Sequence, residues 1–98
     1  MALMEISIVP LGTGQTSISD HVARALRVVR ESGLEFRLGD MGTTVKGDVR
    51  QLLDLAARMH SEVFNQDIMR VYTVIKIDDR RDKTPDFGEK TESVRKKL

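Results

Sequence analysis

The chain has 98 residues, which suffices for one small domain, and we expect a single domain over residues 1–98. Its 16 basic and 15 acidic side chains give a net charge of +1, which argues against a dedicated nucleic-acid-binding protein because such proteins usually carry a strong basic excess. The absence of cysteine excludes disulfide bonds, thiolate metal sites and a cysteine nucleophile. No apolar run is long enough to span a membrane, so we expect a cytoplasmic protein.

The first predicted elements are a strand and a helix. Alternating apolar and polar residues predict a strand over residues 4–9, and we expect Pro10 to end it because proline cannot donate to a ladder. Apolar residues at helical spacing predict an amphipathic helix over residues 18–29, with Ser17 or Ser19 as its N-terminal cap.

A second and a third strand follow this helix. Gly33 suits a left-handed cap at the helix end, and alternation predicts a strand over residues 34–38. A tight turn leads to a short strand over residues 43–46, and Asp48 is a natural N-cap for the next helix. On that helix His60 is expected to be a packed histidine rather than a ligand or a base. The predicted inward face consists of Val49, Leu52, Leu53, Ala56, His60 and Val63.

The last part of the chain is predicted to hold a turn, a strand and a helix. The turn falls at residues 65–67, and the strand over residues 70–77 is apolar on both faces, which predicts a central strand covered on both sides. A short charged helix over residues 89–98 has Val94 and Leu98 as anchors. The order β-α-β-β-α-β plus a terminal helix predicts an α+β, ferredoxin-like fold, with two helices on one face of a four-stranded antiparallel sheet.

The second face of this sheet needs a cover. Val9, Met41, Tyr72 and Val74 have the parity to point there, and a chain this short has a thin core of its own. We therefore expect homo-oligomerisation through stacked sheets, and the alternative is that the C-terminal helix folds back over this face.

Two glycine segments are rich in hydroxyl groups. Residues 10–19 join a strand end to a helix start, where unpaired N–H groups and hydroxyls suit an anion or a polar ring. Residues 39–44 combine two glycines with two threonines. The alternatives are an ordinary capped loop and a hairpin turn, respectively.

The charge run over residues 78–83 is either a solvated surface or an ion-pair network at an oligomer interface, where Asp79, Arg80 and Arg81 would take part. These arginines also compete with any metal ion for the neighbouring carboxylates. No set of nucleophile, base and acid can be identified, so the residues give no indication of an enzyme, and we expect no catalytic residues, metal or cofactor.

Four segments carry a resemblance to a known family, namely Val9-Pro10-Leu11-Gly12-Thr13, Thr16-Ser17-Ile18-Ser19, Met41-Gly42-Thr43-Thr44-Val45 and the run from Tyr72 to Arg81. Together they resemble the small thiamine-binding protein family. The resemblance covers nearly the full chain and implies a ferredoxin-like fold, stacking of sheets into dimers and assembly of dimers into tetramers. It also implies non-catalytic binding of thiamine or its hydroxymethylpyrimidine moiety.

The resemblance implies a pocket formed by the two glycine segments. Hydroxyl groups can bond the ring nitrogens and the amine of an aminopyrimidine, while apolar side chains flank the ring. The implied ligand-binding residues are Leu11, Gly12, Thr13, Ser17, Ser19, Met41, Gly42, Thr43, Thr44 and Lys46.

One position departs from the family pattern. Members often place an acidic residue and a glycine after the Met-Gly-Thr strand, where this chain has Lys46-Gly47. A lysine there favours a phosphorylated relative of thiamine or another anion. A further alternative is a regulatory or structural oligomerisation module without a small-molecule pocket, with Val9, Tyr72 and Val74 at its interface.

Overall fold

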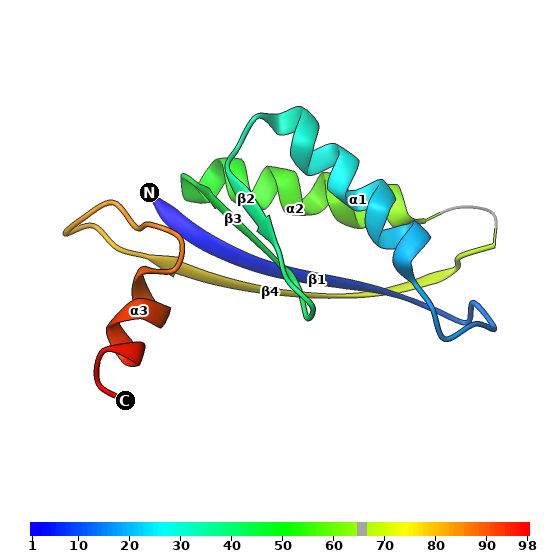
Figure 1. Ribbon diagram of the computed structural model, residues 1–98. Helices are drawn as coiled ribbons and strands as arrows, with labels where there is room; N and C mark the ends of the chain where they lie inside the picture. The colour runs from blue at the N-terminus through cyan, green and yellow to red at the C-terminus, as the bar shows by residue number, and fades with distance from the viewer. Residues whose placement is uncertain (65–66) are drawn as a thin grey trace.

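The computed structural model describes residues 1–64 and 67–98, so most of the turn predicted at residues 65–67 lies outside the described residues. None of the helices in these ranges is both long enough and apolar enough to cross a lipid bilayer. The elements, in chain order, are β1 (Ala2–Leu11), α1 (Ser19–Ser32), β2 (Phe36–Leu38), β3 (Thr43–Gly47), α2 (Val49–Val63), β4 (Arg70–Asp79) and α3 (Glu89–Arg95) (Figure 1).

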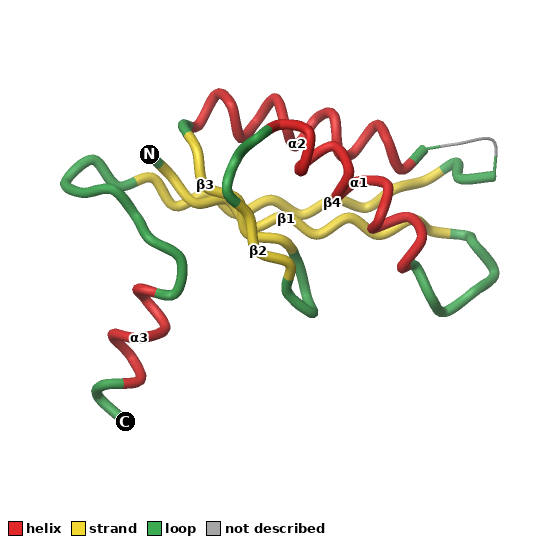
Figure 2. The backbone as a smooth tube through the Cα atoms, turned by 45° about the horizontal axis from the view of Figure 1, so that its top comes forward, coloured by secondary structure: helices red, strands yellow, loops and turns green. Residues whose placement is uncertain are grey.

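The four strands form one antiparallel sheet in the order β2-β3-β1-β4. Helices α1 and α2 lie side by side on one face of the sheet, as Figures 1 and 2 show from two directions. This arrangement confirms the predicted ferredoxin-like α+β fold. We call the sheet face away from α1 and α2 the open face.

The core fills the layer between the sheet and the two helices. Alternate residues of β1 point into it, because side chains along a strand alternate between the two faces. The buried cluster consists of Ala2, Met4, Ile6, Ile8, Ala25, Val28, Val29, Val45, Leu52, Leu55, Ala56, Met59 and Val63.

Strand β1 is longer than predicted. It continues through Pro10 to Leu11, so the prediction that Pro10 ends the strand is wrong. The ladder with β3 stops at Ile6↔Thr43, whereas the ladder with β4 runs on to Leu11↔Arg70. Pro10 is tolerated in the strand because its missing N–H falls on the side from which β3 is already absent.

The two long helices differ in how they begin. Asp48 caps α2 as predicted: its Oδ1 accepts from Gln51 N at 2.9 Å, and Gln51 Oε1 accepts from Asp48 N at 3.2 Å, which completes a capping box. Neither predicted serine caps α1, because Ile18 occupies the N-cap position without a side-chain hydrogen bond. At the other end of α1, Gly33 adopts the predicted left-handed conformation with φ 77°.

The predicted inward face of α2 is partly wrong. Leu53 is 48% exposed, whereas Leu55 and Met59 are buried. The apolar stripe of α2 is centred on Leu52, Leu55 and Met59, at spacings of three and four residues, and Leu53 lies on its flank.

Strand β4 is an edge strand, so the prediction of a central strand covered on both sides is wrong. Its apolar side chains stay accessible: Tyr72 is 60% exposed, and Val74, Ile75 and Ile77 are exposed as well. An apolar strand is typical of burial, but the pattern does not tell whether the same chain supplies the cover.

The C-terminal helix does not fold back over the sheet, which contradicts the alternative cover. Helix α3 projects away from the sheet (Figures 1 and 2), and its predicted anchors Val94 and Leu98 are exposed. Instead, the segment before α3 covers one end of the open face: Pro85 is buried, and the Arg37 guanidinium lies 5.0 Å from the centre of the Phe87 ring.

Candidate ligand-binding site

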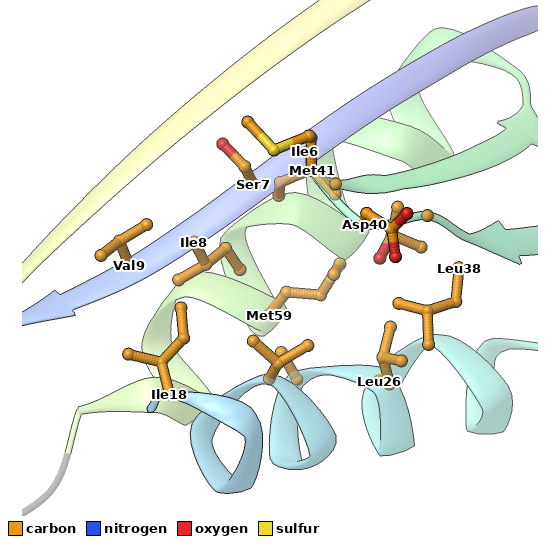
Figure 3. A pocket seen from close by; sticks show the side chains of 15 residues that line it. Ile6, Ser7, Ile8, Val9, Ile18, Leu26, Leu38, Asp40, Met41 and Met59 are labelled. Carbon is orange, nitrogen blue, oxygen red and sulfur yellow. The ribbon is translucent and has the colours of Figure 1, made fainter. Parts of the chain in front are cut away.

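A pocket forms where β1 continues past the short β2–β3 hairpin. It has a volume of about 310 Å³ and lies between β1, α1 and the hairpin turn, with α2 behind it (Figure 3). We call it the β1–α1 pocket. Its lining residues are Ile6, Ser7, Ile8, Val9, Ile18, Val22, Ala25, Leu26, Leu38, Gly39, Asp40, Met41, Gly42, Thr43 and Met59.

The hairpin turn closes against β1 through a glycine. Gly39 N donates to Gly42 O at 2.9 Å, which closes the predicted tight turn. A Cβ atom at Gly42 would lie only 3.1 Å from the Ile6 carbonyl oxygen, so a larger residue would push the turn away from β1. Gly42 therefore fixes the distance between the two walls of the pocket.

The walls of the β1–α1 pocket are mostly apolar. Val22 and Leu26 of α1, and Ile18 at its N-cap, lie on the apolar stripe of this helix but are only half-buried, because their side chains border this space. Thr43 and Asp40 contribute polar side chains to the lining, whereas Ser7 borders the pocket with its side chain directed toward the open face. Asp40 is the one ionisable group among the lining residues. Apolar walls with few polar groups are typical of a small-molecule site.

Three of the predicted ligand-binding residues lie together in this pocket, namely Met41, Gly42 and Thr43. Met41 belongs to the hairpin turn rather than to a strand and is 87% exposed, so the prediction that strand parity directs it to the open face is wrong. Thr43 is buried at the start of β3.

The first glycine segment lies beyond the end of β1 and does not line the pocket. Gly12 has φ 80°, and Thr13 Oγ1 donates to Gln15 O at 3.0 Å and accepts from Gln15 N at 3.2 Å. The Ser17 and Ser19 hydroxyls are hydrogen-bonded to each other at 3.3 Å. These exposed hydroxyls thus bond within their own loop.

Three further predicted residues lie apart from the lining. Leu11 is half-buried at the end of β1, and alternation places Thr44 and Lys46 of β3 on the open face. Lys46 Nζ lies 3.4 Å from Asp86 Oδ1, so this lysine pairs with the segment before α3. The cation that pointed to an anionic ligand is therefore outside the β1–α1 pocket.

The open face carries the residues predicted for an oligomer interface. Val9 is opposite Tyr72 in the β1–β4 register, and Val74 lies two residues further along β4. Glu5 and Lys76 form an ion pair across the same face with Oε1 and Nζ 3.9 Å apart. This face combines an apolar end with a charged middle.

The charge run after β4 forms local ion pairs. Arg81 Nη2 donates to Asp79 Oδ2 at 2.8 Å, and this hydrogen bond holds the pKa of Asp79 below its ordinary value. Arg80 Nε donates to Asp82 Oδ1 at 2.8 Å, which likewise lowers the pKa of Asp82. All four side chains are solvent-accessible, as a solvated surface requires.

Sequence reasoning missed most of the walls of the pocket. Ile6 and Ile8 belong to the buried core as well as to the lining, and no local sequence pattern indicates that β1 extends beyond the end of β3. The signal that was present is Asp40, which stands between Gly39 and Met41 in the second glycine segment. Asp beside Gly is also the ordinary composition of a tight turn, so this signal alone does not separate a ligand contact from a turn residue.

Comparisons with known proteins agree with one another. A UPF0045 protein of Methanothermobacter thermautotrophicus is 35% identical over the full length of both chains. The UPF0045 protein YqgV of Bacillus subtilis is 34% identical, with all of this chain and 98% of that protein covered. Among solved structures, the hypothetical protein MJ1052 of Methanocaldococcus jannaschii superposes with a TM-score of 0.84 at 33% identity, with 95% and 94% of the two chains covered. The sequence model of the family described as Thiamine-binding protein matches residues 4–95, so the chain belongs to this family.

Proposed function

We propose that this protein is a non-catalytic binding protein for thiamine or a related hydroxymethylpyrimidine, with the ligand held in the β1–α1 pocket. Membership of the family supports the ligand class. The observation that carries the proposal is the pocket itself: about 310 Å³ of mostly apolar space is near the lower end of the range for small-molecule sites.

The walls suit a flat aromatic ring. Val22 and Leu26 come from one side and Met41 from the turn, so a ring can lie between aliphatic and thioether groups. The lining contains no cysteine, lysine or histidine that could act as a nucleophile or activate one, which favours binding over catalysis.

The direct test is calorimetric titration with thiamine and with hydroxymethylpyrimidine. Val22→Phe fills the pocket and should abolish the binding heat. Ala23→Phe is the matched control, because Ala23 is exposed on the same helix and does not line the pocket. If neither ligand binds the unmodified protein at millimolar concentration, or if Val22→Phe binds as well as Ala23→Phe, this function is wrong.

We also propose that the protein acts as a homo-oligomer joined through the open face. Tyr72 and Val74 are exposed there beside Val9, and this apolar area is not covered by α3. A symmetric pair of copies would bury it, because the same residues would meet across a two-fold axis. Arg80 and Arg81 follow the end of β4 and would add polar contacts at the margin of such an interface, whereas the Ala2↔Asp79 pairing directs Asp79 to the helix side of the sheet.

A further inference from the structure

The β1–α1 pocket contains an unpaired stretch of main chain. The Ile6 carbonyl oxygen points toward the hairpin, since a Cβ atom on Gly42 would lie 3.1 Å from it. In an antiparallel strand the N–H and C=O of one residue point to the same side, and every second residue shares that side. The peptide groups of Ile8 therefore face the same way as those of Ile6.

Strand β3 offers no partner to Ile8, because its ladder with β1 ends at Ile6↔Thr43. Figure 3 shows this part of β1 running along the pocket, with α1 opposite. The Ile8 N–H and C=O thus present an adjacent donor and acceptor to a molecule in the pocket. Polar main-chain groups that lose water on ligand binding need a hydrogen-bonding partner.

The side chains that line the pocket carry only negative charge. Asp40 is the single ionisable side chain of the lining, and its carboxylate stands at the hairpin turn (Figure 3). No lysine or arginine lines the pocket, and Lys46 is engaged with Asp86 on the opposite face of the sheet. A fixed positive charge on the ligand is favoured here, and an added phosphate is disfavoured.

We propose that Ile8 and Asp40 together make the pocket selective for a cationic aminopyrimidine without a phosphate group. The proposal rests on the function proposed above and adds its specificity. An aminopyrimidine carries a ring nitrogen acceptor next to an amine donor, which matches the Ile8 N–H and C=O. Asp40 then lies near the cationic substituent of the same ligand.

The order of the donor and the acceptor at Ile8 also determines the orientation in which the pyrimidine ring binds. A 4-oxo analogue exchanges the amine for a carbonyl and the ring nitrogen for an N–H, so donor and acceptor are reversed. This analogue must either place its donor and acceptor against the wrong groups of Ile8 or bind with its ring flipped. A flipped ring directs the cationic substituent away from Asp40. Comparing this analogue with thiamine therefore tests the hydrogen bonds between the pyrimidine edge and the Ile8 main chain.

The experiment is calorimetric titration of the full chain with four ligands: thiamine, its 4-oxo analogue, thiamine monophosphate and neutral hydroxymethylpyrimidine. For the unmodified protein we expect the 4-oxo analogue to bind at least about tenfold more weakly than thiamine, because a mispaired polar edge leaves buried groups unsatisfied. We expect thiamine monophosphate to bind more weakly than thiamine.

Two variants distinguish the effect of the Asp40 charge on binding from the effect of removing a negative charge elsewhere on the protein. Asp40→Asn should weaken thiamine about three- to fivefold, as for an exposed ion pair, and leave neutral hydroxymethylpyrimidine within about twofold. Asp54→Asn removes the same charge from an exposed position on α2 and should change neither affinity. Equal binding of thiamine and its 4-oxo analogue, tighter binding of the monophosphate, or an unchanged thiamine affinity in Asp40→Asn overturns this selectivity while the proposed function stands. Absence of binding by all four ligands overturns both.

Discussion

His60 Nδ1 and Thr73 Oγ1 are hydrogen-bonded at 2.7 Å and so join α2 to the edge strand β4. The His60 ring also meets the Phe64 ring edge to face, with the centroids 5.3 Å apart. This half-buried histidine is therefore a packing residue, as the sequence predicted, and its place is outside the β1–α1 pocket.

We expect Thr73→Val to lower the free energy of unfolding by about 1 kcal/mol, because the nearly isosteric valine removes the hydroxyl partner of His60. Urea unfolding measures this change. Ligand affinity should remain that of the unmodified protein, since Thr73 does not line the pocket. An altered affinity with unaltered stability would show that His60 serves the site rather than the fold.

Gly42→Ala should affect both stability and binding. The added methyl would meet the Ile6 carbonyl oxygen at 3.1 Å and Glu5 Cγ at 3.3 Å, so the turn must shift away from β1. We expect a loss of roughly 1–2 kcal/mol in unfolding free energy and weaker ligand binding. Gly47→Ala is the control, because its methyl would have contacts no closer than 3.4 Å. Equal thermal midpoints for the two variants would contradict this account of the turn.

Tyr72→Glu should separate the copies of the chain. A carboxylate at the apolar end of the open face would be buried without a partner on association, which disfavours the assembly. Light scattering after size exclusion should therefore give the monomer mass for this variant. Leu53→Glu places the same charge on an exposed apolar position of α2 and should leave the mass of the oligomer unchanged. A monomeric unmodified protein would refute the interface.

Acid should loosen the C-terminal segment before the core. Hydrogen bonds from Arg81, Arg80 and Lys83 lower the pKa values of Asp79, Asp82 and Glu89, respectively. A carboxyl group with a depressed folded-state pKa stabilises the fold above its unfolded pKa, and this contribution is lost as the pH falls through the folded value.

The loss should begin below about pH 4, the ordinary range of these carboxyls, and should be complete at lower pH because all three pKa values are depressed. Amide chemical shifts followed by NMR from pH 7 downward measure it residue by residue. Signals of residues 80–95 should change before those of the buried strand β1. A simultaneous change in both regions would argue against a separately held tail.

Local chemistry explains which parts of the fold were predictable. The Asp48 capping box depends on Asp48 and Gln51 alone, and the Gly33 cap depends on one backbone conformation, so both follow from short sequence patterns. The position of β4 at the sheet edge depends on pairing across the whole chain. Its apolar residues indicate burial, but they do not say which molecule provides it.

The candidate site was less predictable for the same reason. Of the two glycine segments, the second supplies Met41, Gly42 and Thr43 to the lining of the pocket. The hydroxyls of Thr13, Ser17 and Ser19 are expected to contact a ligand, whereas in the structure they bond one another or their own loop. The pocket arises because β3 is five residues long and β1 is ten, a difference that no local motif encodes.

Pro10 protects the edge of β1 that extends beyond β3 from pairing with another chain. An exposed strand edge invites another polypeptide to extend the sheet. An incoming strand could pair with Ile8, but two residues later it would meet a ring that has no hydrogen to donate, and its own carbonyl would be left unsatisfied. A small ring needs only the Ile8 peptide groups and is not affected by the proline. The same stretch of backbone can therefore stay open to a vitamin-sized molecule and closed to a second chain.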